Sequence, residues 1–498
     1  MRRVAVIGGG IAGLATALHL KDRASTVEGG LEIRLLEAGS RLGGNIRTEH
    51  GDGFTFERGP NGYLDNVPAM ERLVERLQLA PELQKADDAA AKRFLYRNGR
   101  LHPLPSCPLE FLRSPILSLG GRVRVCLEPF SRAGPGGVDE SVHDFARRRI
   151  GAEAADILID AMVSGIFAGN TRRLSLASAF PKMAAMEDVH GSLFTAMIAQ
   201  MREHRAARKQ QRKSSENEPK AEAETRSGGP TGPGGTLTSF RRGLETLIEH
   251  LAEELDGIVR LNHRATAIEP LPAERPDRSD GSRPGWRINA DSVDPLEVDA
   301  VLIATPAVRA APMLKGIDPL LGQEVEGIRS AGLVVVALGF ESSAIGGPPE
   351  GFGFLVPRCQ GLRSLGCLWD SSIFPGRAPA GKTLLRAMVG GAHDPEAVEL
   401  DDEALISVVR QDLEIAMGLT AAPSQVRVFR HPVGIAQYEP GHQARLNLID
   451  ERLRELPGLW VAGSSFYGVS MNACVDMAER QAGTILDFLG LRARTNRG

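Results

Sequence analysis

The sequence has 498 residues, with 59 Lys and Arg against 62 Asp and Glu and a formal net charge of -3. This length predicts two or three structural units with room to bury a large ligand, and the near-neutral charge argues against nucleic acid as the main partner. The five cysteines form neither a CxxC pair nor a Cys/His cluster with zinc spacing, which predicts no metal site and a reduced, cytoplasmic chain.

The stretch "RVAVIGGGIAGLATALHL", residues 3–20, has the pattern of a strand, a glycine-rich turn and a helix. Gly8 permits a tight turn, Gly10 lets a pyrophosphate approach the backbone, and Gly13 lets the helix pack on the strand. The strand "LEIRLLE" follows and ends in Glu37, a carboxylate that can accept hydrogen bonds from a ribose. This order predicts a dinucleotide site. The alternative is a glycine-rich turn that binds no nucleotide.

The same N-terminal stretch resembles a signal peptide, because Met1, Arg2 and Arg3 precede an apolar run. Cleavage would destroy the glycine turn, so we expect no targeting segment. Apolar runs such as "AGLVVVALGF" at 331–340 fall short of the roughly 20 residues that span a bilayer. We therefore expect no membrane crossing.

The segment after Glu37, "EAGSRLGGNIRTEH", places Arg41 and two glycines directly behind the acid. It resembles the second motif of FAD enzymes of the amine oxidase superfamily, whereas a nicotinamide dehydrogenase usually continues into another helix and strand. The next segment, "FERGPNGYL", resembles the turn with which these enzymes bring backbone amides to the flavin. The motif order therefore indicates FAD.

The stretch "AAAKRFLYRNGRLHPLP", residues 89–105, predicts a hairpin that turns at Asn98-Gly99, a pair favoured in type I′ turns. Alternation along the strand puts Arg93, Leu95 and Arg97 on one face, with Phe94 and Tyr96 on the other. Arg93 is either an edge charge that keeps the strand soluble or an anchor for an anionic ligand.

Residues 106–204 have a helical pattern, with Phe145, Ile150, Ala154, Ile157 and Leu158 at helix-like spacing. The stretch "PLEFLRSPILSLGGRVRVCLEPF" within it mixes apolar side chains with arginines, as a segment lying in a lipid interface would. The alternative is that these residues pack inside the protein. Residues 205–235 carry no large apolar residue and predict a disordered linker.

The C-terminal stretch 456–489 predicts a short strand ending at Gly463, a loop, and a helix that begins near Val469 and aims its N-terminus at a ligand. Together with the glycine turn it predicts a discontinuous cofactor unit, completed by the helix in "TLTSFRRGLETLIEHLAEEL" and by the strands "IVRLNHRATAIEP" and "DAVLIATP". The predicted cofactor-binding residues are Gly8, Gly9, Gly10, Ile11, Ala12, Gly13, Glu37, Ala38, Arg41, Gly44, Asn45, Gly59, Pro60, Asn61, Gly62, Ala265, Gly463, Ser464, Val469, Ser470 and Met471.

Nearly the whole chain resembles the oxygen-dependent protoporphyrinogen oxidases and their coproporphyrinogen-oxidising bacterial relatives. The motifs that carry this resemblance include "VAVIGGGIAGL", "LLEAGSRLGGNIRT", "KRFLYRNGRLHPLP", "SGIFAGNTRRLSLASAFP", "GFGFLVP", "LLRAMVGG" and "LWVAGSSFYGVSMNACV". The resemblance implies an α/β fold with three units. They are a Rossmann-like FAD-binding domain (1–88, 236–308 and 432–498), a mixed-sheet substrate domain (89–105 and 309–431) and an inserted helical, membrane-associating domain (106–204).

The resemblance also implies the chemistry: oxidation of a porphyrinogen by hydride transfer to FAD, with O2 as acceptor, H2O2 as product and no catalytic side chain. Leu355, Leu368 and Met388 match positions that sandwich the macrocycle, and Gly165 matches a position that borders it, although a helix terminator is the alternative for this glycine. Arg93 aligns with an arginine that pairs with a propionate and that some coproporphyrinogen-oxidising relatives lack. This favours protoporphyrinogen IX over coproporphyrinogen III and leaves Arg97 as a surface residue.

Further expectations from the resemblance are peripheral contact with the inner face of the membrane, handover of product to a ferrochelatase and a homodimer. Two competing functions are a flavin amine oxidase and a catalytically silent flavoprotein acting as a scaffold. An amine oxidase commonly uses an aromatic cage, and this chain has only four Tyr and three Trp. A silent scaffold would gain nothing from an apolar slot with an arginine at its mouth.

Overall fold

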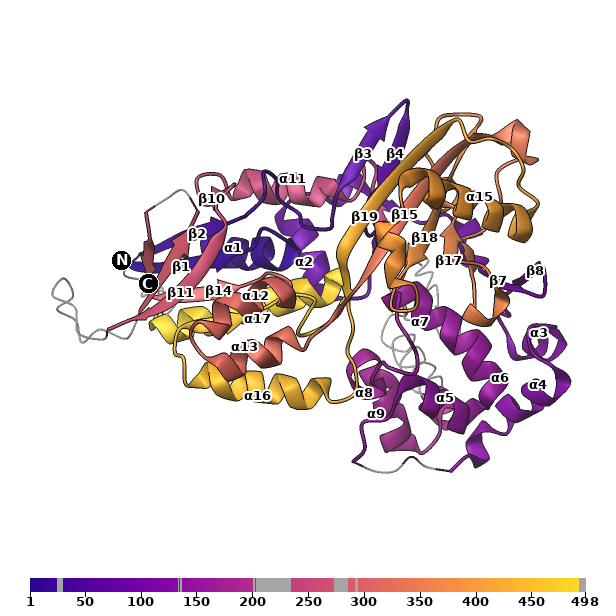
Figure 1. Ribbon diagram of the computed structural model, residues 1–498, viewed down its shortest axis with the longest axis horizontal. Coiled ribbons are helices and arrows are strands. Elements are labelled where there is room, and N and C mark those ends of the chain that lie inside the picture. The colour runs from indigo at the N-terminus through magenta and orange to yellow at the C-terminus, as the bar shows by residue number, and fades with distance from the viewer. Residues whose placement is uncertain are drawn as a thin grey trace, which may run out of the picture.

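The computed structural model describes residues 1–24, 30–132, 134, 137–199, 202, 234–272, 285–291 and 294–491. The predicted linker at 205–235 lies outside these residues except for Gly234 and Gly235. A parallel sheet and a larger, mixed sheet each form the centre of one unit. A group of helices forms a third unit, which lies below the larger sheet in Figure 1. The predicted α/β fold is confirmed.

The N-terminal strand β1 lies at the centre of a five-stranded sheet whose neighbouring strands are all parallel. In spatial order the strands are β10 (Val259–Arg260), β2 (Leu31–Leu36), β1 (Arg2–Ile7), β14 (Ala300–Ile303) and β20 (Leu459–Val461). Both faces of this sheet are covered, so Val4, Ala5 and Val6 are all fully buried. Their uninterrupted apolar run is what a parallel strand with two buried faces requires.

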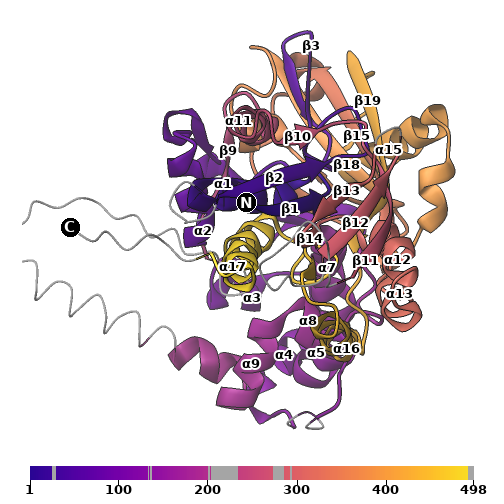
Figure 2. The same cartoon turned by 90° about the vertical axis from the view of Figure 1, so that its left-hand side faces the viewer.

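Helices cover one face of the parallel sheet, and a small sheet with further helices covers the other, as the view along it shows (Figure 2). One face carries α1 (Ile11–Ala24), α2 (Pro68–Arg76), α11 (Glu245–Glu254) and α17 (Met471–Leu489). The other face carries β11 (Ala265–Leu271), β12 (Gly285–Ala290), β13 (Leu296–Val298), α12 (Ala307–Lys315), α13 (Pro319–Glu326) and α16 (His442–Arg454). A second three-stranded sheet pairs β5 (Tyr63–Leu64), β9 (Leu237–Phe240) and β6 (Leu83–Lys85).

Residues 309–329, expected in the substrate domain, belong instead to the core of the parallel sheet. Leu314, Leu321 and Val325 are fully buried in the same apolar cluster as Ile303. Their apolar spacing shows that the helices are amphipathic, but the pattern does not tell which of two sheets they cover. After the hairpin at 94–103, the chain therefore returns to the larger sheet only at Ser330.

The larger sheet has seven strands and combines segments that are far apart in the sequence. In spatial order they are β19 (Gln425–Ala436), β15 (Ser330–Glu341), β18 (Lys382–Gly390), β17 (Ser364–Leu368), β16 (Gly353–Leu355), β7 (Phe94–Arg97) and β8 (Arg100–Pro103). All pairs are antiparallel except β16 with β7. Helix α15 (Asp402–Met417) covers one face, and the aromatic side chains of β4 (Phe54–Glu57), which pairs with β3 (Thr48–Gly51), pack on the other.

The predicted hairpin at 89–105 is confirmed as β7 and β8, with Arg97 opposite Arg100. Asn98 and Gly99 both have positive φ, 50° and 78°, as a type I′ turn demands. Leu95 is buried among residues of the helical unit, whereas Tyr96 is buried in the core of the sheet. The two faces therefore differ as the alternation predicts.

The helical unit contains α3 (Pro108–Arg113), α4 (Leu119–Cys126), α5 (Val142–Ile150), α6 (Ala152–Ala154), a π-helical turn (Ala155–Ile159), α7 (Asp160–Phe167), α8 (Leu176–Ala179) and α9 (Pro181–His190). The helical pattern predicted within 106–204 is broken at Gly151, where φ is 92°. Of the helices described, none is long and apolar enough to cross a bilayer.

Candidate functional site

One continuous cavity of about 3210 Å³ runs from the glycine turn of the parallel sheet to the space between the larger sheet and the helical unit. Its lining includes all of the predicted substrate-contacting residues, Arg93, Gly165, Leu355, Leu368 and Met388. It also includes every predicted cofactor contact except Gly13 and Arg41. The structure therefore places the two predicted sets of residues along one space.

The glycine turn at the start of α1 forms one end of the cavity. Gly8 has a φ of 111°, and its amide donates to Leu36 O at 2.8 Å. A Cβ on Gly13 would lie 2.0 Å from Gly8 O, which explains why Gly13 packs the helix against the turn rather than facing the cavity. A Cβ on Gly10 would meet nothing within 4 Å, so the backbone here faces open space. A phosphate can approach it closely.

Glu37 lies beside this turn at the end of β2, and its carboxylate is held by two backbone amides. Gly9 N donates to Oε2 and Gly39 N donates to Oε1, each at 2.7 Å. Each carboxylate oxygen can accept more than one hydrogen bond, so the fixed group retains acceptor capacity toward the cavity that it lines. This geometry suits the hydroxyl groups of a ribose.

Arg41 has a different position from the one predicted, because it does not line the cavity. Its Nη1 donates to Leu42 O at 2.9 Å and its Nη2 donates to Gly44 O at 2.7 Å. The guanidinium thus holds the loop in which Gly43 and Gly44 have positive φ. Its contact with the cofactor stays a prediction.

A buried ion pair holds the turn Gly59–Gly62, and nothing in the sequence indicated this pair. Arg386 Nε lies 3.0 Å from Asp370 Oδ2, and the two side chains are 3% and 4% exposed. Arg386 Nη1 donates to Gly59 O at 2.6 Å. A Cβ on Gly59 would lie 2.1 Å from Asn45 O, so the two loops touch. The turn is consequently fixed in the cavity wall.

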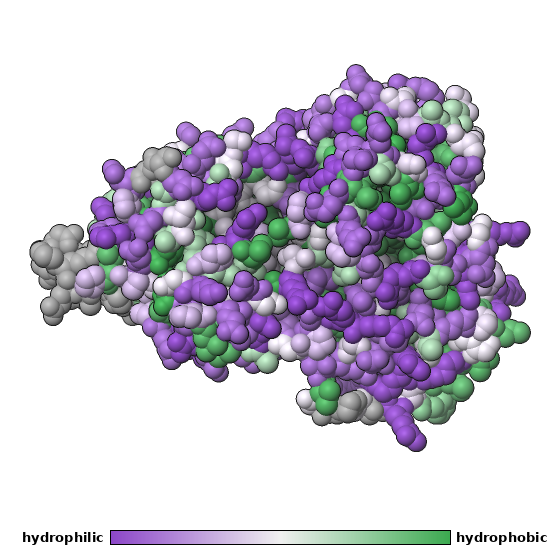
Figure 3. Space-filling view, viewed as in Figure 1, coloured by the Kyte–Doolittle hydropathy of each residue, from purple (hydrophilic) through white to green (hydrophobic). Residues whose placement is uncertain are grey.

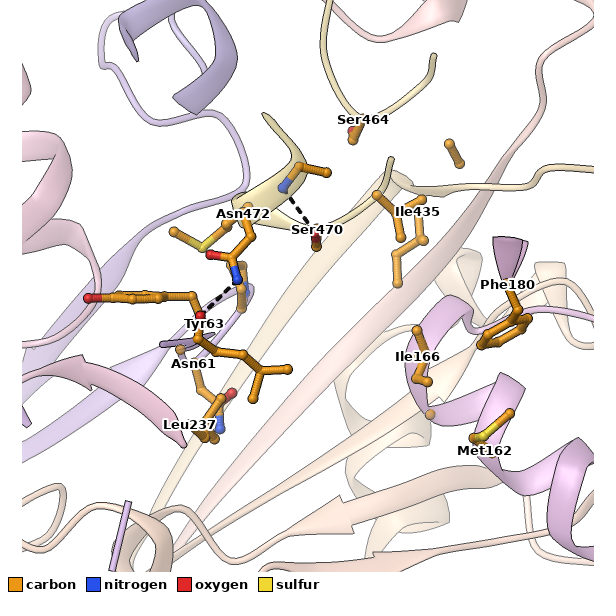
Figure 4. Close-up of a pocket in the computed structure, with 18 of the residues that line it drawn as sticks. Asn61, Tyr63, Met162, Ile166, Phe180, Leu237, Ile435, Ser464, Ser470 and Asn472 are labelled. Atoms are coloured by element: carbon orange, nitrogen blue, oxygen red, sulfur yellow. Dashed lines mark hydrogen bonds between the residues drawn. The ribbon is translucent and has the colours of Figure 1, made fainter. Parts of the chain in front are cut away.

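The loop after β20 also contributes to the wall of the cavity. Ser470 begins α17, and its Oγ accepts a hydrogen bond from Ala473 N at 3.1 Å. Asn472 Nδ2 donates to Leu64 O at 2.8 Å, which joins the start of α17 to β5 (Figure 4). Ser464, Ser470 and Met471 all line the cavity. The positive end of the helix dipole therefore faces it.

The apolar part of the cavity lies between the larger sheet and α7. A Cβ on Gly165 would lie 2.7 Å from Leu355 Cδ2, so this glycine lets the helix approach β16 closely. It lies inside α7, which ends at Phe167, so the helix-terminator alternative is wrong. Met162, Ile166, Phe180 and Ile435 form a further wall facing the cavity (Figure 4). Met162 and Ile166 are four residues apart on α7, a spacing that could have identified them beside Gly165.

His431 is another lining residue that sequence reasoning missed. Its Nε2 lies 2.7 Å from Arg58 O, a carbonyl that can only accept, so Nε2 carries the hydrogen. Burial lowers the pKa of this imidazole. Nothing in the sequence around His431 distinguishes it from an ordinary strand residue, because its partner is 373 positions away.

Arg93 faces the cavity without a carboxylate partner among the described residues. Its guanidinium carbon lies 5.0 Å from the centre of the Phe352 ring, and the surrounding protein lowers its pKa. The side chain is exposed, and it lines the cavity. This arrangement agrees with the interpretation of Arg93 as an anchor for an anionic ligand.

Arg97, which was expected at the surface, is partly buried in the structure. Its Nη2 lies 2.8 Å from Glu153 Oε1, and its side chain is 16% exposed. Glu153 also accepts hydrogen bonds from Ser118 N and Oγ, at 2.8 and 2.6 Å. The helical unit covers this end of the hairpin, a contact that the local sequence could not reveal. Arg97 therefore joins two units.

These contacts fit an FAD molecule. The open glycine turn and Glu37 offer what a pyrophosphate and a ribose need, and the Gly59–Gly62 turn and the start of α17 offer backbone amides farther along the same cavity. In contrast, the wall formed by Leu355, Leu368 and Met388 is apolar and suits a flat ring system.

Comparison with known proteins agrees with this geometry. The family described as flavin containing amine oxidoreductase matches residues 11–486. Coproporphyrinogen III oxidase of Bacillus subtilis (strain 168) is 30% identical, with 98% of each chain covered. Protoporphyrinogen oxidase of Bos taurus is 32% identical over 97% of this chain and 98% of its own. The chloroplastic protoporphyrinogen oxidase of Oryza sativa subsp. japonica is 31% identical, over 97% of this chain and 88% of its own.

Solved structures show the same fold. A crystal structure from Exiguobacterium sp. 255-15, provisionally assigned as a protoporphyrinogen oxidase, matches with a TM-score of 0.78 and 29% identity, covering 98% of this chain and 99% of that one. Cyclohexylamine oxidase from Brevibacterium oxydans IH-35A matches with a TM-score of 0.66 and 16% identity, covering 98% and 99%. The second match supports the fold alone.

Proposed function

The chain belongs to the flavin-containing amine oxidoreductase family, and from this premise we propose that it is an FAD-dependent porphyrinogen oxidase of haem biosynthesis. One observation of the structure carries the choice of substrate class. The guanidinium of Arg93, which has no carboxylate partner within the described part of the chain, borders an apolar slot. This slot and the predicted dinucleotide site share one cavity. A porphyrinogen presents a large apolar macrocycle with propionates at its edge, which matches this distribution of groups.

The residues of the chain position the reactants and keep water away, while bound FAD supplies the hydride acceptor. Leu355, Leu368 and Met388 hold the macrocycle, and Arg93 holds a propionate by a charge-assisted pair. Arg386, paired with Asp370, holds Gly59 O and thereby fixes the Gly59–Gly62 turn, which would hold the flavin. The first amides of α17 would face the bound cofactor, where the positive end of the helix dipole would favour negative charge.

The substrate that we favour is protoporphyrinogen IX, with coproporphyrinogen III as the alternative. The support for protoporphyrinogen IX is Arg93, whose single unpaired guanidinium suits propionates gathered on one side of the ring. Relatives named for each substrate match the chain at similar identity, so the matches favour neither. We further propose that O2 accepts the electrons and that H2O2 is released.

A direct assay tests this function. Purified holoprotein is incubated in air with protoporphyrinogen IX, with coproporphyrinogen III or with a polyamine, while porphyrin fluorescence and peroxide are followed. We expect fluorescence and peroxide to rise together with a porphyrinogen, and the ratio of the two kcat/KM values to identify the substrate. Fluorescence no faster than the enzyme-free control with both porphyrinogens would refute the proposal, and peroxide with the polyamine would favour an amine oxidase.

We also propose that the helical unit contacts the inner face of a membrane peripherally, with the protein in the cytoplasm. Leu119, Val123 and Phe130 are 74%, 57% and 84% exposed, although Ile116 and Leu117 of the same stretch are buried. Apolar side chains are visible at the edge formed by α3 and α4 (Figure 3). In this proposal the exposed residues of the stretch contact lipid, whereas Ile116 and Leu117 pack inside the protein. Two further expectations stay predictions: the handover of product to a ferrochelatase, and the formation of a homodimer.

A further inference from the structure

Tyr438 lies just beyond β19 and reaches under the loop that leads to α17. Its hydroxyl donates to Ser464 O at 2.6 Å and accepts from Gly468 N at 2.8 Å. The side chain is only 3% exposed. One phenol therefore connects two backbone groups at either end of a five-residue stretch of this loop.

His442, the first residue of α16, contacts both Tyr438 and the same loop. Its ring stacks on that of Tyr438, with centroids 4.1 Å apart and planes inclined by 15°. Its Nε2 lies 3.4 Å from Phe466 O. The two rings thus engage the loop at residues 464, 466 and 468, all from a segment that lies outside both the glycine turn and α17.

The loop needs such support because its backbone is unusual. Gly463 and Gly468 have φ values of 104° and 127°, which permit sharp changes of direction. Ser464, at the start of the stretch contacted by the two rings, and Val469, directly after it, line the cavity. The position of Ser464 and Ser470 in the cavity wall is visible in Figure 4. A displacement of this loop would therefore move the start of α17 relative to a bound cofactor.

We propose that Tyr438 is a positioning residue for FAD, whose hydroxyl fixes the 463–470 loop and thereby the direction of the first amides of α17. Removing the hydroxyl leaves Ser464 O and Gly468 N without this partner, which is costly for groups inside a protein. The inference depends on the FAD site and not on the identity of the substrate, so it can fail or hold independently of porphyrinogen oxidation.

The loop supplies a matched control. Tyr467 is on the same loop, but its hydroxyl donates to Asp450 Oδ1 at 2.7 Å on α16 and its ring packs against the parallel-sheet core. Tyr438→Phe and Tyr467→Phe each remove one hydroxyl from this region. Only the first substitution removes hydrogen bonds to the backbone of the loop.

The test compares both variants with the parent holoprotein. FAD affinity is measured by titrating the apoprotein, the bound flavin by its visible spectrum, and its midpoint potential by equilibration with a reference dye. We expect Tyr438→Phe to raise the Kd for FAD about tenfold, as the loss of two hydrogen bonds implies. Its potential should fall and its flavin spectrum should change, while KM for the substrate stays unchanged. Tyr467→Phe should match the parent protein.

Three results would overturn the proposal. They are equal effects of both variants on affinity and potential, no effect of Tyr438→Phe, or a loss of thermal stability in Tyr438→Phe without any change at the flavin. If Tyr438→Phe does not fold, His442→Phe retains a stacking ring but loses the contact with Phe466 O. We expect this variant to shift the affinity and the potential in the same direction by a smaller factor, and unchanged values would also overturn the proposal.

Discussion

Arg93 and Arg97 show how two arginines on one face of one hairpin can have different roles. Arg97 pairs with Glu153 of the helical unit, whereas Arg93 points its charge into the cavity and contacts the ring of Phe352. The sequence placed both on the same face and singled out Arg93, which lines the cavity. It could not place Arg97, because Glu153 is 56 positions away.

Replacing Arg93 tests its role as the anionic anchor. Arg93→Ala should raise KM for the porphyrinogen about tenfold to a hundredfold, the effect of losing one charge-assisted pair. Steady-state kinetics measure this change, and the flavin absorption of the purified variant should stay that of the parent protein. Arg97→Ala is the control on the same face. It should lower the melting temperature because it breaks the contact with Glu153, and a larger effect on KM than that of Arg93→Ala would reverse the assignment.

At the scale of elements, the contact between α7 and β16 sets the width of the apolar slot. The glycine at position 165 permits this contact, since any side chain there would meet Leu355. Local sequence identified the glycine, the hairpin and the nucleotide-binding turn, because each depends on neighbouring residues. It could not identify Met162 and Phe180 as walls of the cavity, or assign α12 and α13 to the parallel sheet, because those outcomes depend on how distant elements pack.

A methyl group at position 165 should therefore narrow the slot. In Gly165→Ala the new Cβ would push the end of the Leu355 side chain toward the ring site, so we expect KM for the porphyrinogen to rise severalfold while FAD stays bound. Gly120→Ala in α4 is the control, because its Cβ would approach no atom closer than 3.9 Å. Leu355→Ala combined with Gly165→Ala should restore part of the affinity, and additive losses in the double variant would contradict this explanation.

Across the whole molecule, acid should weaken the fold through buried histidines. Burial lowers the pKa of both His393 and His442 to about 4, from an ordinary value of 6.5. Between these values the unfolded chain binds more protons than the folded one, so each histidine lowers the free energy of unfolding as the pH falls from 6.5 to 4. The full contribution to stability is present above pH 6.5.

Thermal or urea unfolding between pH 4 and 7 measures this effect. His393→Gln should reduce the pH dependence by up to about 1.4 kcal/mol per pH unit in that window, the equivalent of one proton. His190→Gln is the control, because His190 is exposed at the end of α9. An unchanged slope in His393→Gln would show that this histidine does not remain neutral in the folded protein.

Membrane contact is also a property of the whole molecule, and the exposed residues of α4 offer its test. Leu119→Glu combined with Val123→Glu should abolish co-sedimentation with vesicles of mixed neutral and anionic lipids, because charged side chains are costly in the lipid interface. Activity in detergent should stay at the parent level, since neither residue lines the cavity. Equal co-sedimentation of parent and variant would place the contact elsewhere or exclude it.

The order of strands in the parallel sheet determines when during synthesis the cofactor site can form. β14 pairs with β1 on one side and with β20 on the other, and α17 packs against α1. At roughly 5–20 residues per second, a ribosome needs about 20–90 s to add the residues between the first strand and the last. Throughout that interval the glycine turn of the nascent chain lacks β20 and α17, which complete the cofactor site. FAD can therefore be captured firmly only near the end of translation, which makes flavin incorporation a late event that reports on completion of the fold.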